Sequence, residues 1–375
     1  MTGAGLTRRQ YFLLCSLAVL SPLLRLVPQE TAAYAGHVSW LCAAAAYGPL
    51  LLFGLLLNAM LRARRPGEGM GELILRALGP VFGRGLLAVY ALCFLLYAAF
   101  LLRSGADRFL TSVSIFRSAW PYAAVLLILA LFGALGGPKP LFRAAEIFYP
   151  ALMALLLFAL LFALPQLHVR RLFAVSAADA APVLRGAVPL LNIGCGMLFY
   201  PTFFEGRVSA LEGRGGAVAG WLARLCLLAA VLNAVAVSML GASLTAHLSY
   251  PFFTMLRNVS IFHAVERFEA LIVGMWVLPD FALLALMLLL ASGAARTVLG
   301  CPPKNDGGGR LFRLENGRIV IWICAAAVFV LAQLLTPNAF TLREWSCRII
   351  PAATLILTAG CVPVIFLIGK LRKTL

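Results

Sequence analysis

Charged residues inside apolar segments are the first candidates for chemistry in this sequence of 375 residues. Arg25 follows Ser21 and Pro22 in the first apolar segment, and Asp280 lies within the eighth. A charge at membrane depth is costly and indicates ligand or ion binding unless it is paired or reaches the interface. Because opposite charges hold each other ionised, we predict that Arg25 and Asp280 interact, directly or through a ligand. Two alternatives stay open: Arg25 snorkels to the outer head groups, or Asp280 is a neutral acid hydrogen-bonded to a neighbouring helix.

A glycine-containing segment at residues 188–205 is the second candidate, since it places Asn192, Gly194 and Gly196 within an apolar run. Glycine inside a helix costs about 1 kcal/mol relative to alanine, and lipid cannot satisfy the backbone groups that a break exposes. A break survives where it lines a protein cavity. We therefore predict a helix broken at the two glycines that forms half of a ligand site. The alternative is that the glycines let helices pack closely.

The first apolar segment supplies the other half of the predicted site, because Ser21 and Pro22 interrupt it. The ends of broken helices present free N–H groups and a partial positive charge. Both suit an anionic group such as an amino acid carboxylate. The predicted ligand-binding residues are Ser21, Pro22, Leu24, Arg25, Asn192, Gly194, Gly196 and Asp280.

Signatures of enzymes, cofactors and metal sites are absent from the sequence. It contains no HExxH, GxSxG or phosphate-loop pattern, its four histidines lack the spacing of metal ligands, and its nine cysteines form no CxxC. We therefore expect no catalytic residues, no cofactor and no metal.

Composition indicates the class of protein. Hydrophobic residues make up 62% of the chain, charged residues make up 12%, and the mean hydropathy is +0.96, which is typical of a polytopic protein in a lipid bilayer. The net charge of +17 would suit nucleic acid in a soluble protein. Here the basic residues stand in short gaps between apolar segments, where they set topology. We expect no nucleic-acid partner.

Ten apolar segments have the length of a membrane span, roughly 20 residues. Lys and Arg concentrate in alternate gaps between them, which predicts that both termini are cytoplasmic. Residues 70–80 are predicted to form an amphipathic helix in the membrane interface, and residues 293–317 a flexible cytoplasmic connector. The ten segments are 10–35, 38–61, 84–104, 119–135, 142–164, 186–207, 218–246, 268–292, 318–337 and 348–369.

These segments predict an all-α polytopic membrane protein with ten transmembrane helices in a single integral membrane domain, residues 1–375. They divide as five plus five, with repeat one at about 8–165 and repeat two at about 184–370. The first and sixth helices, both predicted to be broken, occupy matching places and run in opposite directions. Such an inverted repeat, with a site between two broken helices, is typical of secondary transporters.

The stretch from Tyr250 to Leu271, followed by Trp276, resembles the pattern that precedes and opens the eighth helix in the spore germination permease family. The matching features are the proline, the arginine followed by an aliphatic residue and Ser-Ile, the Glu-Arg-x-Glu-Ala and the later tryptophan. This family contains the B-type subunits of nutrient germinant receptors in endospore-forming bacteria, and the similarity runs through almost the whole chain. Further matches are Thr7 to Tyr11, Leu26 to Pro28, Leu78-Gly79 and Arg143 to Glu146.

The resemblance implies the amino acid, polyamine and organocation transporter fold, with ligand held where helices 1 and 6 unwind. It also implies sensing of a small amino-acid-like germinant, an A-type membrane subunit and a C-type lipoprotein subunit as partners, and a place in the spore inner membrane or the cell membrane. This chain departs from the family where it has Ser21-Pro22 in place of glycine, where Arg25 follows, and at Asp280. The alternative function is a proton- or sodium-coupled amino acid permease, which could use Asp280.

Overall fold

The computed structural model describes residues 7–65, 68–112, 118–173, 175–204, 215–257, 268–300, 310–335 and 338–373. Within these ranges the chain forms helices and no strands, which confirms the all-α prediction. Parts of the 250–271 motif and of the 293–317 connector lie outside the described residues. In the part of the chain that the structure describes, eight helical stretches are long and apolar enough to cross a membrane: residues 27–62, 80–110, 138–166, 177–203, 215–240, 276–298, 317–335 and 340–371.

The sequence predicted ten spans, whereas the described residues contain eight candidate spans, so this prediction is confirmed only in part. The predicted segment at 119–135 is a helix of 16 residues, shorter than a typical span. The predicted segment at 10–35 consists of a helix with arginines at both ends and a second helix that continues into the next apolar stretch. All ten predicted segments fall on helices, but a ten-helix inverted repeat does not follow from length and composition alone.

The first half of the chain begins with a helix that enters the middle of the molecule and ends near residue 166. Its elements are α1 (Arg8–Arg25), α2 (Val27–Ala35), the 3-10 helix η1 (Gly36–Leu41), α3 (Cys42–Arg62), α4 (Met70–Leu78), α5 (Pro80–Ser112), α6 (Trp120–Leu135), α7 (Pro138–Ala163) and the 3-10 helix η2 (Leu164–Gln166).

The second half follows after a connection of short 3-10 helices, η3 (Val169–Leu172) and η4 (Ala177–Asp179). Its last helical stretch contains two π-helical turns, η7 and η8. The elements are α8 (Ala180–Gly186), α9 (Val188–Phe199), the 3-10 helix η5 (Tyr200–Phe203), α10 (Gly215–Leu240), α11 (Ala242–His247), α12 (Pro251–Arg257), α13 (Phe268–Val298), α14 (Arg310–Leu335), α15 (Ala339–Glu344), η7 (Trp345–Ile349), α16 (Ile350–Leu355), η8 (Ile356–Gly360) and α17 (Cys361–Leu371).

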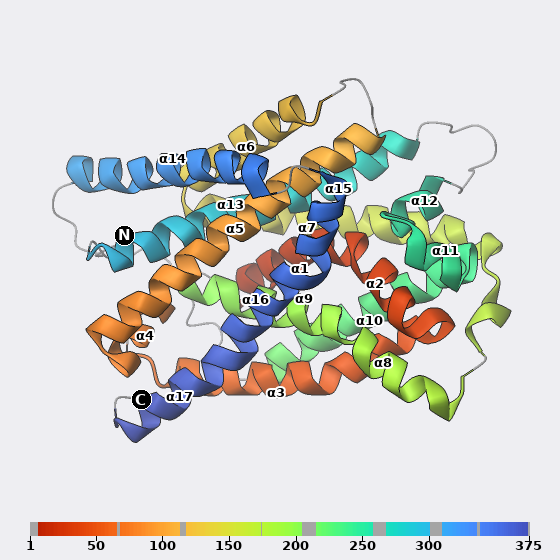
Figure 1. Cartoon of the computed structure of the whole chain (residues 1–375), viewed down its shortest axis with the longest axis horizontal. Coiled ribbons are helices and arrows are strands. Elements are labelled where there is room, and N and C mark those ends of the chain that lie inside the picture. Colours follow the sequence, from red (N-terminus) through yellow and green to blue (C-terminus); the bar gives the residue numbers. More distant parts are fainter. Residues whose placement is uncertain are drawn as a thin grey trace.

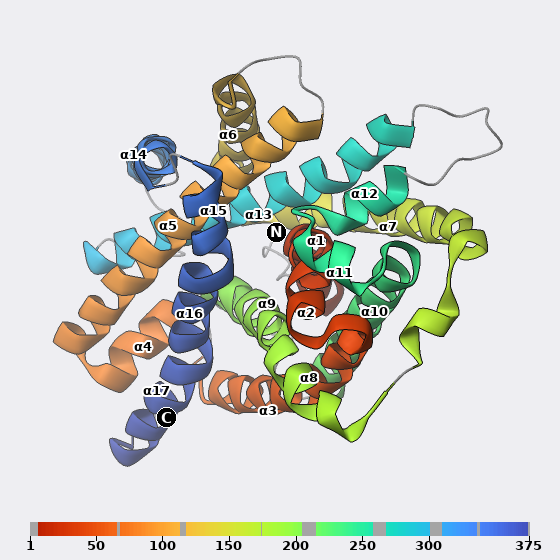
Figure 2. The ribbon, with the colours of Figure 1, turned by 45° about the vertical axis from the view of Figure 1, so that its right-hand side comes forward.

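Helices α1 and α9 lie in the interior of the bundle (Figures 1 and 2). Helix α1 packs against α7, α13 and α9, and α9 also packs against α3 and α16. The two longest helices, α5 and α13, lie side by side, while α14 and α6 cover them from outside. Both chain ends and α4 lie at the left of Figure 1.

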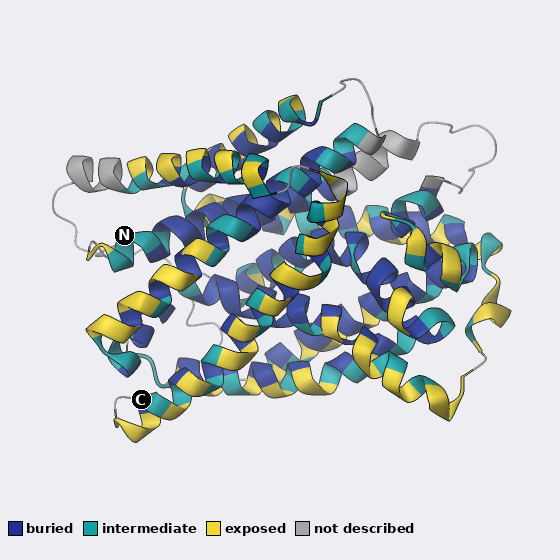
Figure 3. Cartoon of the chain, in the orientation of Figure 1, coloured by how far each residue is buried: buried dark blue, intermediate teal, exposed yellow. Residues whose placement is uncertain are grey.

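Burial follows this arrangement (Figure 3). The central helices are buried on most sides, whereas the peripheral helices expose large apolar side chains such as Phe132 of α6, Leu161 of α7 and Ile323 of α14. An apolar outer surface is what a lipid bilayer requires, because no water is present there to reward polar groups. The surface therefore agrees with the composition in indicating a membrane protein.

The predicted amphipathic helix at 70–80 is present as α4. Its apolar face, made of Leu73, Ile74 and Ala77, is buried, and the helix packs against α5 and α17. Gly79, with a φ of +86°, ends α4 and lets the chain turn at once into α5. The existence and the face of this helix were correctly predicted.

The break predicted at Ser21 and Pro22 is wrong in position. Helix α1 continues through Pro22 to Arg25, and only Leu26 separates it from α2. The N–H of Leu26 donates to the carbonyl of Pro22 over 2.9 Å, so the helical bonding resumes directly after that proline. The interruption instead precedes Pro28, which stands in the first turn of α2, where a missing N–H costs nothing.

The break predicted at Gly194 and Gly196 is also wrong, because α9 is continuous from Val188 to Phe199. A Cβ atom at Gly194 would lie 2.5 Å from Cδ2 of Leu50, and one at Gly196 would lie 3.0 Å from Cγ2 of Thr354. Both glycines thus permit close helix packing, which was the alternative interpretation. The helix is interrupted at its two ends, by one residue at Ala187 and by the tighter η5 turn from Tyr200.

Candidate functional site

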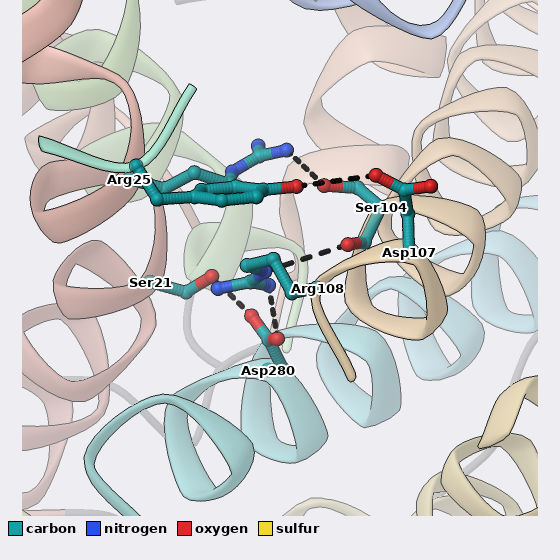
Figure 4. A network of polar contacts seen from close by, with 7 residues as sticks. Ser21, Arg25, Ser104, Asp107, Arg108 and Asp280 are labelled. Atoms are coloured by element: carbon teal, nitrogen blue, oxygen red, sulfur yellow. Dashed lines mark hydrogen bonds and ion pairs between the residues drawn. The ribbon is translucent and has the colours of Figure 1, made fainter. Parts of the chain in front are cut away.

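A buried polar cluster joins α1, α5 and α13 (Figure 4). We use this name for Ser21 and Arg25 of α1, Ser104 and Arg108 of α5, and Asp280 of α13, all of which are buried. Helix α13 packs against both α1 and α5, so the polar side chains of the three helices meet inside an otherwise apolar bundle. The structure therefore brings together three of the predicted site residues, Ser21, Arg25 and Asp280.

Asp280 is the acidic centre of this cluster and is 3% exposed. The Ser21 hydroxyl donates to its Oδ1, and Nη2 of Arg108 forms an ion pair with its Oδ2. A Cβ atom at Gly105 would lie 3.4 Å from Oδ2, so glycine at this position gives the carboxylate its space against α5. Both carboxylate oxygens have partners, and Asp280 forms a buried ion pair with Arg108.

Arg108 is fixed by further contacts on its own helix and on α13. Its Nε donates to the backbone carbonyl of Ser104 over 3.4 Å, and its guanidinium lies 5.6 Å from the centre of the Trp276 ring. A cation over an indole face is attracted by the ring's negative surface. Trp276 and Asp280 are one helical turn apart, so α13 supplies both supports for this arginine.

Arg25 is buried, but no acidic side chain of the described residues forms an ion pair with it. Its Nη1 donates to the hydroxyl of Ser104, and its guanidinium lies 4.8 Å from the centre of the Phe100 ring. Among the described residues, its Nε and Nη2 have no hydrogen-bond partner. The side chain is 5% exposed, so it does not reach the head groups. The predicted direct pair with Asp280 is wrong, because Arg108 holds that carboxylate.

Tyr250 lies at the edge of the buried polar cluster. Its hydroxyl donates to Oδ2 of Asp107, a neighbour of Arg108 on α5, over 3.4 Å. Tyr250 precedes α12 and lies outside the candidate spans. Burial raises the pKa of Tyr250 to about 12, with the carboxylate of Asp107 adding to the rise and Arg108 and Arg25 opposing it. The phenol therefore remains a hydrogen-bond donor at physiological pH.

The predicted site residues on α9 occupy a different environment. Asn192 is buried, and its Oδ1 has no hydrogen-bond partner within the described ranges of the chain. Gly194 and Gly196 face Leu50 and Thr354 as described above. Among the described residues, no hydrogen bond or ion pair joins α9 to the buried polar cluster. Leu24 and Pro22 are buried in α1.

Three polar residues of this region were missed by sequence reasoning: Ser104, Arg108 and Glu30. Arg108 was missed because the span was expected to end at 104, whereas α5 runs to Ser112. Ser104 was the last residue of that expected span, and its role was not predicted. Glu30 lies in α2, is 8% exposed, and its Oε1 has no hydrogen-bond partner among the described residues. A signal was available for Glu30, since it is a lone acidic residue in the first apolar segment.

Two cavities are lined by residues outside the cluster. One of about 390 Å³ opens between α4, α5, α13 and α14, and its lining includes Glu72, Arg296 and Arg318. A second, of about 30 Å³, is enclosed by α5, η5 and the last helical stretch. Among the described residues, no group of three or more His, Cys, Asp or Glu side chains could hold a metal ion.

The fold and the cluster define an integral membrane protein with a charged interior, of transporter-like construction. Comparison with protein families identifies it more closely. The family model for spore germination proteins, the spore permeases, matches residues 6–340. The chain belongs to this family, which is of a transporter or receptor type rather than an enzyme family. No curated protein matched the chain.

Proposed function

We propose that this chain is the transporter-like membrane subunit of a spore nutrient germinant receptor, which binds a small amino-acid-like germinant and triggers germination. The observation that carries the proposal is the family match together with a buried, charged cluster in the centre of the bundle. Polar groups at such depth are costly and are retained for ligand or ion recognition. The spore inner membrane is the proposed location, with both termini cytoplasmic.

The proposed ligand site lies between the end of α1 and the first turns of α9. It comprises Ser21, Pro22, Leu24, Arg25, Asn192, Gly194, Gly196 and Asp280. Its support is that α1 and α9 pack together and that both carry buried polar atoms without partners, on Arg25 and Asn192. Each of the interruptions at Leu26 and Ala187 lies two residues before a proline, Pro28 or Pro189, which has no N–H to donate.

The architecture that we propose is a five-plus-five inverted repeat, with repeats at about 8–165 and 184–370. Its support is that helices α1 and α9, which lie near the starts of the two halves, are interior and that each borders an interruption, at Leu26 and at Ala187. As partners we propose an A-type membrane subunit and a C-type lipoprotein subunit. These would receive a ligand-driven movement, because a sensor needs a neighbour to act on.

The state of Asp280 supports a sensor over an ion-coupled permease. A permease that uses this carboxylate must release it from Arg108 each time it takes up a proton or sodium ion. Separating a buried ion pair costs about 3–5 kcal/mol. The guanidinium of Arg108 stands where a permease would bind its coupling cation, so ligand binding by this chain needs no coupled ion.

The experiment is a deletion of the gene in the native host, with spores tested on amino acids, glucose and inosine by the fall in optical density. We expect loss of the response to at least one nutrient and its recovery on complementation. Liposomes containing the purified chain should show no uptake of that nutrient driven by a proton or sodium gradient. Unchanged germination together with gradient-driven uptake would establish the permease instead.

A further inference from the structure

The cavity of about 390 Å³ contains charged side chains that the proposed receptor site does not use, and we call it the interhelix cavity. Its charged lining residues are Glu72 of α4, Arg296 of α13 and Arg318 of α14, so its net charge is positive. Arg296 lies about 24 Å along α13 from Asp280, because a helix rises about 1.5 Å per residue. The interhelix cavity is therefore separate from the buried polar cluster.

Both arginines of the interhelix cavity lie at the ends of candidate membrane spans. Arg296 is close to the end of the span 276–298, and Arg318 is close to the start of the next one, 317–335. The end of one span and the start of the next lie on the same side of a bilayer. The two guanidinium groups thus lie at one membrane boundary, where the phosphate groups of lipids flank the hydrocarbon core.

Two close approaches bring the parts of this cavity together. A Cβ atom at Gly317, which precedes Arg318, would lie 3.2 Å from Nη1 of Arg296, so glycine lets this guanidinium lie directly against α14. A Cβ atom at Gly71 would lie 3.8 Å from Oγ1 of Thr297, so the first turn of α4 lies against α13 beside Arg296. Both arginines and the start of α4 therefore converge on the cavity.

These groups together have the chemistry of an anion receptor. In the described part of the chain, Arg296 and Arg318 form no hydrogen bond and no ion pair, and no side chain caps the start of α4 at Gly69. The N–H groups of a first helical turn have no partner within the helix, and with the helix dipole they favour an anion. Guanidinium groups match phosphate oxygens with pairs of parallel hydrogen bonds.

Much of the remaining lining is apolar and includes Leu87, Phe203, Leu290 and Ile321. A small soluble anion would gain nothing from such a wall, whereas the hydrocarbon of a lipid would be removed from water by it. On the proposed topology this boundary is cytoplasmic, and basic pockets between membrane helices on that side bind anionic head groups. The combination of positive charge and apolar wall thus favours an anionic lipid over a soluble anion.

We propose that the interhelix cavity binds an anionic phospholipid, with its phosphate on Arg296 and Arg318 and the start of an acyl chain against the apolar wall. Glu72 repels the phosphate and lowers the affinity. The bound lipid contacts α4, α13 and α14 at once, so it stabilises the folded chain. This inference goes beyond the proposed receptor function and holds whether the chain senses a nutrient or transports one.

The test uses the full chain in detergent micelles and measures lipid binding by native mass spectrometry during a titration. The probes are dioleoyl phosphatidylglycerol, the matching phosphatidylcholine, whose fixed cation cancels the phosphate charge, and the matching diacylglycerol, which lacks a phosphate. We expect the first phosphatidylglycerol to bind about tenfold more tightly than either of the other two. It should also raise the melting temperature of the chain.

Four variants separate the parts of the site. The double variant Arg296→Gln/Arg318→Gln should remove the preference for phosphatidylglycerol. A Cβ atom at Gly293, which lines the cavity, would meet nothing within 4 Å, so Gly293→Phe should fill part of the space and block the lipid with both arginines present. Glu72→Gln should strengthen binding. The matched control is Arg84→Gln, at an exposed position of α5 outside the lining, and it should change nothing.

Three results would overturn the proposal. The first is that phosphatidylglycerol and phosphatidylcholine bind equally well. The second is that Arg84→Gln weakens binding as much as the double variant, because surface charge and not the cavity would then attract the lipid. The third is that glycerophosphoglycerol, which is the same head group without acyl chains, binds as tightly as the lipid, because the ligand would then be a soluble phosphate. If the double variant does not fold, Gly293→Phe and Glu72→Gln still decide, since unchanged binding in both excludes the cavity.

Discussion

Helices α1 and α9 both seemed from their sequences to be interrupted in mid-span, and both are continuous there for different reasons. In α1 the proline is accommodated and the polar side chains face partners on α5 and α13. In α9 the glycines face Leu50 and Thr354, which come close because no side chain intervenes. The comparison shows that a charged residue in an apolar segment predicts a site better than a glycine does, because a charge must find a partner whereas a glycine has two common uses.

The largest effect should come from breaking the ion pair that holds α5 to α13. Arg108→Ala leaves Asp280 buried with only the Ser21 hydroxyl, so we expect a loss of about 3–5 kcal/mol in the free energy of unfolding. The double variant Arg108→Ala/Asp280→Ala should recover much of this loss, since no unpaired carboxylate remains. Thermal unfolding of the purified protein measures both.

The control for this prediction is Arg103→Ala, which removes an arginine from the same helix at a partly exposed position. It should change stability far less than Arg108→Ala. If the losses of Arg108→Ala and Asp280→Ala simply add, the two side chains do not depend on each other and the cluster is not the organising feature of α1, α5 and α13.

A smaller effect is expected in α9, where the packing interpretation can be tested directly. Gly194→Val inserts a branched side chain against Leu50, which is completely buried, so we expect a loss of about 1–3 kcal/mol. Leu50→Ala in the same chain should relieve part of the crowding. The measurement is again the midpoint of thermal unfolding, compared for the two single variants and the double variant.

Gly220→Val is the matched control, because a Cβ at Gly220 of α10 would meet nothing within 4 Å. It should not lower stability, because no neighbour is crowded and helix propensity favours valine over glycine. If Gly194→Val is tolerated as well as Gly220→Val, close packing does not explain the glycine, and a ligand-lining role for α9 becomes the better account.

The sequence was sufficient to predict the helical class, the position of α4 and three members of the buried polar cluster. Hydropathy located these because burial in lipid or protein selects apolar residues over whole segments. It could not locate the partner of Asp280, because Arg108 lies beyond the expected end of a span and only the real length of α5 brings it to α13. Nor could it decide the role of Gly194, since the neighbour that explains the glycine, Leu50, is 144 residues away in the chain.

The smallest effect should come from Tyr250, at the edge of the cluster. Tyr250→Phe removes the hydrogen bond to Asp107 and should cost about 0.5–1.5 kcal/mol. Because the pKa of Tyr250 is raised to about 12, its contribution is fully present below the unfolded pKa of about 10 and is lost as the pH rises toward 12. The difference in unfolding free energy between the two proteins should therefore be constant from pH 6 to 9. Tyr34→Phe, at an exposed position of α2, is the control and should have no effect. A difference that changes within this pH range would mean that another group near Asp107 titrates with Tyr250, and that the edge of the cluster is not held by a neutral phenol.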